Sequence, residues 1–253
     1  MLYKKLISSL FIAVTGLVLS VSPAHAGYGD NLCKKNGFKC VKVKKGDTWG
    51  KLFSNSSERE LVQRLNRMNI EPRGGQVIAV PKDLDSARLM DYAPFPKLIK
   101  VSDRTSRVVV SQKDLAWGAY DMRGQLLKWG PISAGKGYCK DIGEKCVTPQ
   151  GDFQTIRKMG SDCVSTIFPA NEGGAPMPYC IFFKGGIALH GSPEVPGYNA
   201  SHGCVRLFVE DAAWLNNNFV EVGMTRVLVD KPIPAAPPGA VAKVYIEDLT
   251  PWH

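Results

Sequence analysis

Short apolar runs separated by polar turns recur through the second half of the chain. The runs are rich in β-branched residues, as in Arg107–Val110, and Asp121–Gly124 has the composition of a turn between two of them. Regularly spaced short strands of this kind favour an all-β sandwich or barrel over alternating strands and helices. The expected strands are 98–101, 107–110, 114–120, 125–129, 187–189, 205–207 and 225–230.

One segment in this half of the chain has helical character. Residues 209–217 carry Glu210 and Asp211 in what would be the first turn, where carboxylates complement the helix dipole. We therefore predict a mainly β domain over residues 97–231, a β-sandwich with one short helix after Cys204.

The pattern changes between residues 41 and 82, where two strand-like runs enclose two helical ones. Asp47 or Thr48 is a candidate N-cap for the first helix. Ser57–Glu60 has the form of a capping box for the second helix. This order predicts a small α+β module of βααβ type.

The first residues have the composition of a secretory signal. Lys4 and Lys5 precede an apolar run, and Ala24-His25-Ala26 follows as a small-residue cleavage site. The run is too short and too interrupted for a membrane span, so we expect no span in the mature protein. The expected organisation is signal peptide 1–26, N-terminal segment 27–40, module 41–82, linker 83–96, catalytic domain 97–231 and C-terminal tail 232–253.

The charge balance narrows the class of partner. The chain has 32 Lys and Arg against 23 Asp and Glu, a net charge of +9 at neutral pH. A basic surface suits an acidic polymer, which could be nucleic acid, anionic lipid or cell wall. Export makes nucleic acid the least favoured of these. We expect a periplasmic or otherwise extracytoplasmic, wall-associated protein.

Seven cysteines give an odd count. Six of them form three pairs of sequence neighbours, and short loops close most readily. Although other connectivities are possible, we favour Cys33–Cys40, Cys139–Cys146 and Cys163–Cys180, each contributing roughly 2–3 kcal/mol in an oxidising compartment. Cys204 is left over, which indicates a free thiol with a function; the alternative is a different pairing that uses Cys204.

The candidate chemistry is concentrated in one stretch. Ile187–Leu189 has the pattern of a buried strand that ends in His190, and Val205–Leu207 that of a second strand preceded by Cys204. The segment between them is rich in proline and glycine and predicts a loop, which can bring His190 beside Cys204. A thiol near an imidazole forms a thiolate more easily, and this pair is the minimal activated nucleophile for acyl transfer.

The turn Ser201–Cys204 can also aim backbone N–H groups at one point, and an oxyanion donor of this kind lowers a barrier by roughly 3–4 kcal/mol. Three other interpretations compete. Cys204 could be a buried structural thiol. His190, His202 and Cys204 could bind zinc, although a second cluster of ligands with metal spacing is lacking in the sequence. Arg206 could be an ordinary strand residue.

Two motifs carry a family resemblance. His190-Gly191, followed by Ser201-His202-Gly203-Cys204-Val205-Arg206, resembles the signature of the L,D-transpeptidase catalytic domain. Thr148–Phe153 resembles the Thr-Pro-x-Gly-x-Phe strand of the same family. Together the motifs are highly specific, and residues 96–231 fit the order of segments in that family.

The resemblance implies a role for each residue of the stretch. Cys204 would be the nucleophile and His190 the proton donor and acceptor, oriented by the Gly191 carbonyl. His202 and Gly203 would shape the oxyanion site beside Cys204. We expect no cofactor and no metal. The expected substrate-binding residues are Arg206, Ser201 and Tyr179.

The implied reaction is acyl transfer on peptidoglycan stem peptides. The thiol would attack the L,D bond of a tetrapeptide stem, release D-alanine and pass the acyl group to an amine, giving a 3–3 cross-link. Water as acceptor would make the protein a carboxypeptidase or endopeptidase, and a protein lysine would make it an anchoring enzyme. A non-enzymatic wall-binding surface protein is the alternative from another class.

Residues 41–82 resemble a lysin motif, which implies binding to peptidoglycan glycan; a structural spacer is the alternative. Two loops are candidate walls of the site. Gly135–Lys145 is a hairpin tip that Cys139–Cys146 would clip. Met159–Tyr179 exceeds the roughly 12–15 residues of ordinary loops, and we expect a lid latched by Cys163–Cys180. A decorative insertion is the alternative.

Overall fold

The computed structural model describes residues 27–167 and 175–236. The expected signal peptide (1–26), the centre of the long loop (168–174) and residues 237–253 of the expected tail lie outside these residues. Within the described ranges, no helix combines the length and the apolar character needed to cross a bilayer.

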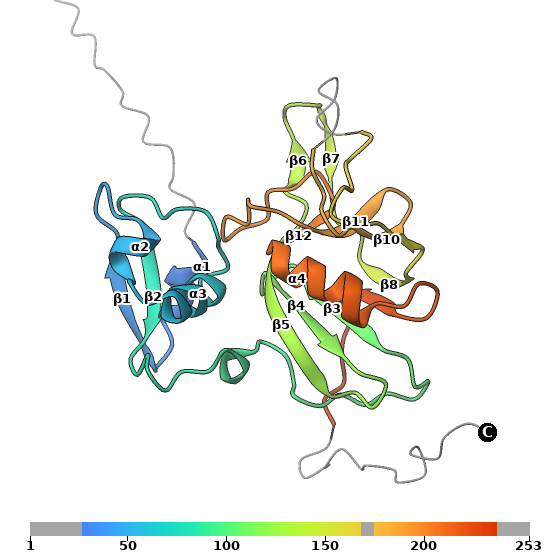
Figure 1. Ribbon diagram of the computed structural model, residues 1–253, viewed down its shortest axis with the longest axis horizontal. Coiled ribbons are helices and arrows are strands. Elements are labelled where there is room, and N and C mark those ends of the chain that lie inside the picture. The colour runs from blue at the N-terminus through green and yellow to red at the C-terminus, as the bar shows by residue number, and fades with distance from the viewer. Residues whose placement is uncertain (1–26, 168–174, 237–253) are drawn as a thin grey trace, which may run out of the picture.

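The N-terminal elements form a small unit beside the larger domain (Figure 1). They are α1 (Tyr28–Leu32), β1 (Phe38–Lys42), α2 (Trp49–Leu52), α3 (Ser56–Leu65) and β2 (Val77–Pro81). β1 and β2 pair antiparallel, with Phe38 opposite Pro81 and Lys42 opposite Val77. β1 thus begins within the segment expected to precede the module. The buried cluster of this unit is Val43, Trp49, Val62, Met68, Ile78 and Val80.

The start of α3 differs from the expectation. Asn55 is the N-cap, and its Oδ1 accepts hydrogen bonds from the backbone N–H groups of Ser57 (2.9 Å) and Glu58 (3.3 Å). The expected capping box at Ser57–Glu60 is therefore wrong, because Ser57 already lies inside the helix. Asparagine and serine are about equally favourable N-caps, so the sequence Asn55-Ser56-Ser57 alone does not determine at which residue the helix begins.

The larger domain is built on one nine-stranded mixed sheet, in the order β8-β13-β3-β4-β5-β12-β11-β10-β9. Its strands are β3 (Arg107–Ser111), β4 (Ala116–Tyr120), β5 (Leu126–Ser133), β8 (Gly151–Gln154), β9 (Arg157–Lys158), β10 (Ile181–Lys184), β11 (Ile187–Gly191), β12 (Val205–Leu207) and β13 (Arg226–Val229). β6 (Gly137–Cys139) and β7 (Glu144–Cys146) form a separate hairpin. The expected strand 98–101 is absent from the described sheet. Leu98 and Ile99 make isolated bridges with Gln125 and Ala235.

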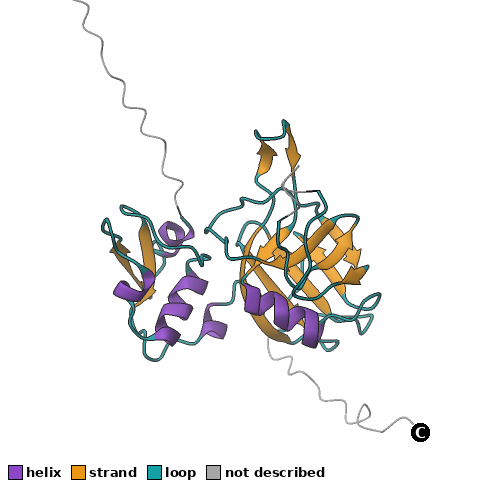
Figure 2. Ribbon diagram, turned by 45° about the horizontal axis from the view of Figure 1, so that its top comes forward, coloured by secondary structure: helices purple, strands orange, loops and turns teal. Residues whose placement is uncertain are grey.

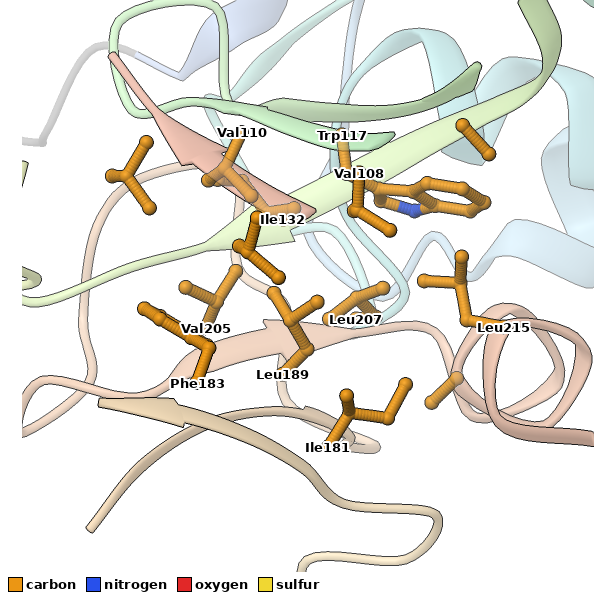
Figure 3. Packing of buried hydrophobic residues seen from close by; sticks show 14 of the residues in the cluster. Val108, Val110, Trp117, Ile132, Ile181, Phe183, Leu189, Val205, Leu207 and Leu215 are labelled. Carbon is orange, nitrogen blue, oxygen red and sulfur yellow. The ribbon is translucent and has the colours of Figure 1, made fainter. Parts of the chain in front are cut away.

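The sheet curls, so that its two halves face each other across the main core. The expected two-sheet sandwich is therefore a single curled sheet, joined where β12 pairs with β5 through Arg206–Ser133 and Leu207–Ile132. Trp117 and Ile132 from one half pack toward Leu189, Val205 and Leu207 from the other (Figure 3). α4 (Val209–Trp214), followed by a π-helical turn over Leu215–Phe219 (η2), closes the core with Ala212 and Leu215.

The N-terminal unit lies beside the larger domain (Figure 2), and side chains of the two are in contact. Arg64 of α3 is 4% exposed, and its guanidinium lies 2.7 Å from the fully buried carboxylate of Asp211 and 3.1 Å from Glu210. Lys128 also pairs with Asp211, at 3.2 Å. The Arg64 guanidinium further stacks on the Phe208 ring, 5.1 Å from its centroid. The two units are therefore joined by a buried ionic contact in addition to the chain between them.

Replacing Arg64 by alanine is expected to destabilise the protein by about 3 kcal/mol. Asp211 has no exposed surface, and after the change Lys128, at 3.2 Å, is the ionic partner that remains for it among the described residues. A buried carboxylate whose charge is not fully compensated destabilises the folded state. Glu60→Gln removes a 56% exposed partner of the same arginine and should cost less than about 1 kcal/mol. Urea unfolding measures both. If both variants lost the same small amount of unfolding free energy, the Arg64–Asp211 ion pair would not be the stabilising contact described here.

Candidate active site

β11 and β12 lie side by side and parallel, which fixes the places of the two principal candidates. Leu189 pairs with Val205, and His190 pairs with Arg206. Side chains alternate between the faces of a strand, and Leu189 and Val205 point into the core (Figure 3), so His190 points to the other face. Cys204 directly precedes Val205 and therefore shares the face of His190. The fold thus brings the expected nucleophile and base together as diagonal neighbours.

The His190 ring has a defined tautomer. Its Nδ1 lies 2.9 Å from the Gly191 carbonyl oxygen, and a carbonyl can only accept, so Nδ1 carries the proton and Nε2 keeps a lone pair. Burial lowers the pKa of His190 from 6.5 to about 4; the Gly191 hydrogen bond opposes this shift, and the charge on Arg206 adds to it. At neutral pH the ring is uncharged and can accept a proton.

Cys204 is the free cysteine among the described residues, and its side chain is half-buried. Its Sγ lies 3.7 Å from the Gly186 carbonyl oxygen. Burial raises the pKa of the Cys204 thiol, while a backbone hydrogen bond from Ala188 and the charge on Arg206 act in the opposite direction. The resting pair is therefore a neutral thiol beside a neutral imidazole. This reverses the expectation that the imidazole favours a resting thiolate.

The turn that carries Cys204 is held from within. The Ser201 hydroxyl accepts a hydrogen bond from the Gly203 N–H (3.0 Å) and donates one to the Cys204 carbonyl. Ser201 is 2% exposed, and its hydroxyl braces the turn, so its expected contact with a substrate stays a prediction. The Gly203 N–H is likewise committed to Ser201. Gly203 has φ of +136°, a conformation that favours glycine, so its contribution is the shape of the turn.

Thr148 holds the same turn from the opposite side. Its fully buried hydroxyl donates to the Gly203 carbonyl (2.6 Å) and accepts from the Gly135 N–H (2.9 Å). In the sequence, Thr148 stands out only as the first residue of the Thr-Pro-x-Gly-x-Phe motif, and no role was expected for it. Its place in that motif was the available signal, but the contact joins residues 55 positions apart and is decided by the fold.

Replacing Thr148 by valine is expected to reduce acyl transfer at least about tenfold, because the turn that carries Cys204 loses a brace and misplaced reacting groups are costly. Two backbone groups also lose their partner, which costs about 1–3 kcal/mol of stability. Thr155→Val is the matched control. Thr155 is equally buried and bonds Glu221 and Gly223, away from the turn, so its loss should affect stability alone. Unchanged activity in Thr148→Val would contradict this role.

His202 is tied to the hairpin β6–β7. Its Nε2 lies 2.6 Å from Asp141, whose carboxylate also pairs with Lys136 at 3.2 Å. The hydrogen bond with His202 is the main cause that lowers the pKa of Asp141 to about 2. His202 therefore links the turn to the hairpin tip. The sulfurs of Cys139 and Cys146 also lie within 4.8 Å of a His202 ring nitrogen, but in a disulfide they are not the thiolates that metals bind.

The other two expected substrate-binding residues lie in different environments. Arg206 shares the face of His190, is 23% exposed, and places its Nη1 3.5 Å from the Glu194 carboxylate. Tyr179 is half-buried, has a left-handed backbone with φ of +59°, and packs against the main core. Arg206 thus borders the candidate site, whereas the contacts of Tyr179 are with the core.

The described ends of the long loop, residues 159–167 and 175–179, contribute to a cluster beside Cys204. Cys163 and Cys180 are bonded, with Cα atoms 6.2 Å apart, and form a buried cluster with Met177, Phe182 and Ala188 against which Cys204 packs. The structure contains the three disulfides favoured by short loops: Cys33–Cys40, Cys139–Cys146 and Cys163–Cys180. The last of these lies in the wall beside the candidate nucleophile.

Comparison with known structures returns L,D-transpeptidases. One from Xylanimonas cellulosilytica is 26% identical, with 67% of this chain and 76% of that chain covered and a TM-score of 0.49. One from Stackebrandtia nassauensis is 20% identical, with 70% and 79% covered and a TM-score of 0.46. One from Mycobacterium smegmatis is 24% identical, with 50% and 59% covered and a TM-score of 0.41, so this chain spans about six tenths of that protein.

A search of curated proteins gives no match. A family model of the L,D-transpeptidase catalytic domain, YkuD, matches residues 105–229. The match does not extend to residues 41–82, so the lysin-motif resemblance stays a prediction. The match does include both motifs that carry the family resemblance, Thr148–Phe153 and the stretch from His190 to Arg206. Over residues 105–229 the chain therefore contains a catalytic domain of the YkuD family of L,D-transpeptidases.

Proposed function

We propose that this protein is a peptidoglycan L,D-transpeptidase that makes 3–3 cross-links through a thioester on Cys204. One observation carries the proposal. The free thiol of Cys204 shares a strand face with His190, whose Nε2 has an available lone pair. A thiol paired with a neutral base is the arrangement that general-base activation of a nucleophile requires.

The neutral resting pair suggests the order of proton transfers. As the Cys204 sulfur attacks the carbonyl carbon of the L,D bond, the thiol proton passes to Nε2 of His190. The protonated ring then gives that proton to the leaving amine of D-alanine, and the thioester remains. An acceptor amine attacks the thioester, loses its proton to His190, and the thiol is reprotonated as it leaves. The scheme uses no cofactor.

The surroundings of the pair suggest how a stem peptide is held. We assign Arg206 to contact with the substrate, since it pairs with His190 in the strand register and its charge acts on both Cys204 and His190. The backbone of the turn His202–Cys204 would stabilise the oxyanion, although the Gly203 N–H is engaged by Ser201. The segment around the Cys163–Cys180 disulfide, with Met177, would form one wall of the site.

The N-terminal unit would bind the glycan of the same polymer, as its resemblance to a lysin motif implies. An extracytoplasmic, wall-associated location is consistent with the family of the catalytic domain and with three disulfides. The proposed partners are therefore peptidoglycan stem peptides and glycan.

Incubation of the folded, disulfide-intact protein with purified tetrapeptide muropeptides, followed by mass spectrometry, tests this function. Cross-linked dimers with loss of one D-alanine are the expected product. Loss of D-alanine alone would identify a hydrolase, and transfer to an added lysine-containing envelope protein would identify an anchoring enzyme. Unchanged muropeptides together with retained glycan binding would overturn the enzymatic proposal in favour of a wall-binding protein.

A further inference from the structure

The loop that joins His190 to Cys204 is held by two different parts of the chain. Its second half is fixed within the catalytic domain. The Ser133 hydroxyl donates to the Tyr198 carbonyl (2.8 Å) and accepts from the Ala200 N–H (3.0 Å), and the Asn199 side chain accepts from the Ala134 N–H (2.9 Å). This half leads directly into the turn that carries Cys204.

The first half of the loop is fixed by the N-terminal unit. The Asn69 side chain donates to the Ser192 carbonyl (2.9 Å) and accepts from the Val195 N–H (2.8 Å). The Asn69 backbone N–H adds a third bond, to the Val195 carbonyl (3.0 Å), and Met68 bridges to Pro196. One asparagine of the N-terminal unit thus engages the loop on both sides of Glu194.

The two backbones also approach closely next to this contact. Gly197 has φ of +86°, and a Cβ at this position would lie 3.3 Å from the Asn66 carbonyl oxygen. A side chain at 197 would push the loop away from the N-terminal unit. The backbones of residues 66–69 and of the loop are therefore in close contact, and we call this contact the backbone joint.

Glu194 connects this joint to the active-site face. Its carbonyl and carboxylate oxygens lie 3.3 and 3.5 Å from Nη1 of Arg206. Arg206 pairs with His190 in the parallel register and shares the face of Cys204. A continuous set of contacts therefore leads from Asn69, through the loop and Glu194, to the charge beside the candidate nucleophile and base.

We propose that Asn69 is a positioning residue, through which the N-terminal unit places Arg206 beside Cys204 and His190 and so sets the reactivity of the thiol. The proposal rests on the proposed function only in taking Cys204 as the reacting group. It gives the N-terminal unit a part in the chemistry, independent of any glycan binding.

The electrostatics of the face make this placement measurable. The positive charge of Arg206 lowers the pKa of both Cys204 and His190. Other charged groups also lie on the elements around the thiol. The Glu194 carboxylate pairs with Arg206, Asp141 of the hairpin contacts His202 and pairs with Lys136, and Arg157 of β9 stacks on Phe182. On the side of the long loop, the nearest sulfurs are in a disulfide and do not titrate. If the loop relaxes and Arg206 moves away, the thiol becomes harder to ionise.

The rate of alkylation of Cys204 by iodoacetamide, measured against pH on the full, disulfide-intact chain, tests the proposal. In Asn69→Ala the midpoint of the rate profile should rise by roughly half a pH unit, and the rate at pH 7 should fall about threefold. Asn55→Ala is the matched control. It removes an asparagine of the same unit that caps α3 and makes no contact with the loop among the bonds described, so its profile should match the wild type.

The route through Arg206 is tested by a double mutant. Arg206→Ala should raise the midpoint by itself, and Asn69→Ala added to it should cause no further rise. A wild-type profile in folded Asn69→Ala, or an equal rise from Asn69→Ala in the Arg206→Ala background, would overturn the proposal.

If Asn69→Ala does not fold, Asn69→Asp replaces it, since aspartate keeps the acceptor for the Val195 N–H and loses the donor to Ser192; the same rise is then expected. The outcome is separable from that of the proposed function. Inertness of the wild type toward muropeptides would reject the transpeptidase activity, while the alkylation profiles would still decide the role of Asn69.

Discussion

Cys204→Ala is expected to abolish cross-linked product, with a loss on the order of 10⁶-fold, the scale that removal of a covalent nucleophile produces. His190 and the braced turn remain in this variant, but no atom is left to form the thioester. The assay is mass spectrometry of tetrapeptide muropeptides after incubation with enzyme, as for the wild type. Neither cross-linked dimers nor loss of D-alanine should exceed the enzyme-free background.

The same variant should keep its fold, which makes the loss of activity interpretable. The Cys204 side chain is half-buried and belongs to none of the three disulfides. The thermal unfolding midpoint should therefore stay within a few degrees of the wild type. Cys204→Ser keeps a side-chain oxygen of similar size and should be almost as inactive, because the imidazole must then deprotonate a far weaker acid. Cross-linking by a folded Cys204→Ala protein would reject the thioester mechanism.

His190→Asn is expected to reduce transfer by about 10²- to 10⁴-fold, the usual contribution of a general acid–base. Asparagine can place an amide N–H near the position of Nδ1 and keep the hydrogen bond to the Gly191 carbonyl. It has no counterpart to the lone pair on Nε2. The thiol, whose pKa is raised by burial, then loses its proton acceptor. Steady-state cross-linking rates at neutral pH measure the effect, and a loss below about tenfold would contradict it.

The same substitution should change how stability depends on pH. The His190 pKa falls from 6.5 to about 4 on folding, so between these values the unfolded chain binds a proton that the folded protein excludes. The titration of His190 therefore does not change the free energy of unfolding above pH 6.5, and it progressively lowers that free energy as pH falls toward 4. The full contribution is about 3 kcal/mol.

Urea unfolding at pH 7 and pH 4 measures this contribution. Between pH 7 and pH 4, the free energy of unfolding of the wild type should fall by about 3 kcal/mol more than that of His190→Asn. The carboxylates that also titrate in this range are common to both proteins, so the difference isolates the imidazole. Cys204→Ala, which keeps the imidazole, should lose as much as the wild type. Equal losses in wild type and His190→Asn would show that the ring is not held neutral by burial.

Local sequence patterns predicted those features that depend on neighbouring residues. Apolar runs ending in His190 and beginning after Cys204 were sufficient to place both residues at strand ends. Three close cysteine pairs were sufficient to predict three short disulfides, since the loop-closure argument needs only sequence separation. The pattern failed where local signals were nearly equal. Asn55 and Ser57 are both good caps, and Leu98–Val101 has a strand-like composition but finds only isolated bridge partners.

By itself, the sequence determined the chemical groups and their order: one unpaired cysteine, one histidine at a strand end, and a family signature that includes both. The tertiary structure decided their protonation states and the hydrogen bonds that hold the segments around them in place. Burial made the resting pair neutral, and contacts between distant residues, such as Thr148 with Gly203 and Asn69 with Ser192, fixed the turn and the loop. The physical reason is that strand and turn preferences act over a few residues, whereas desolvation and hydrogen bonding depend on whatever the fold places alongside.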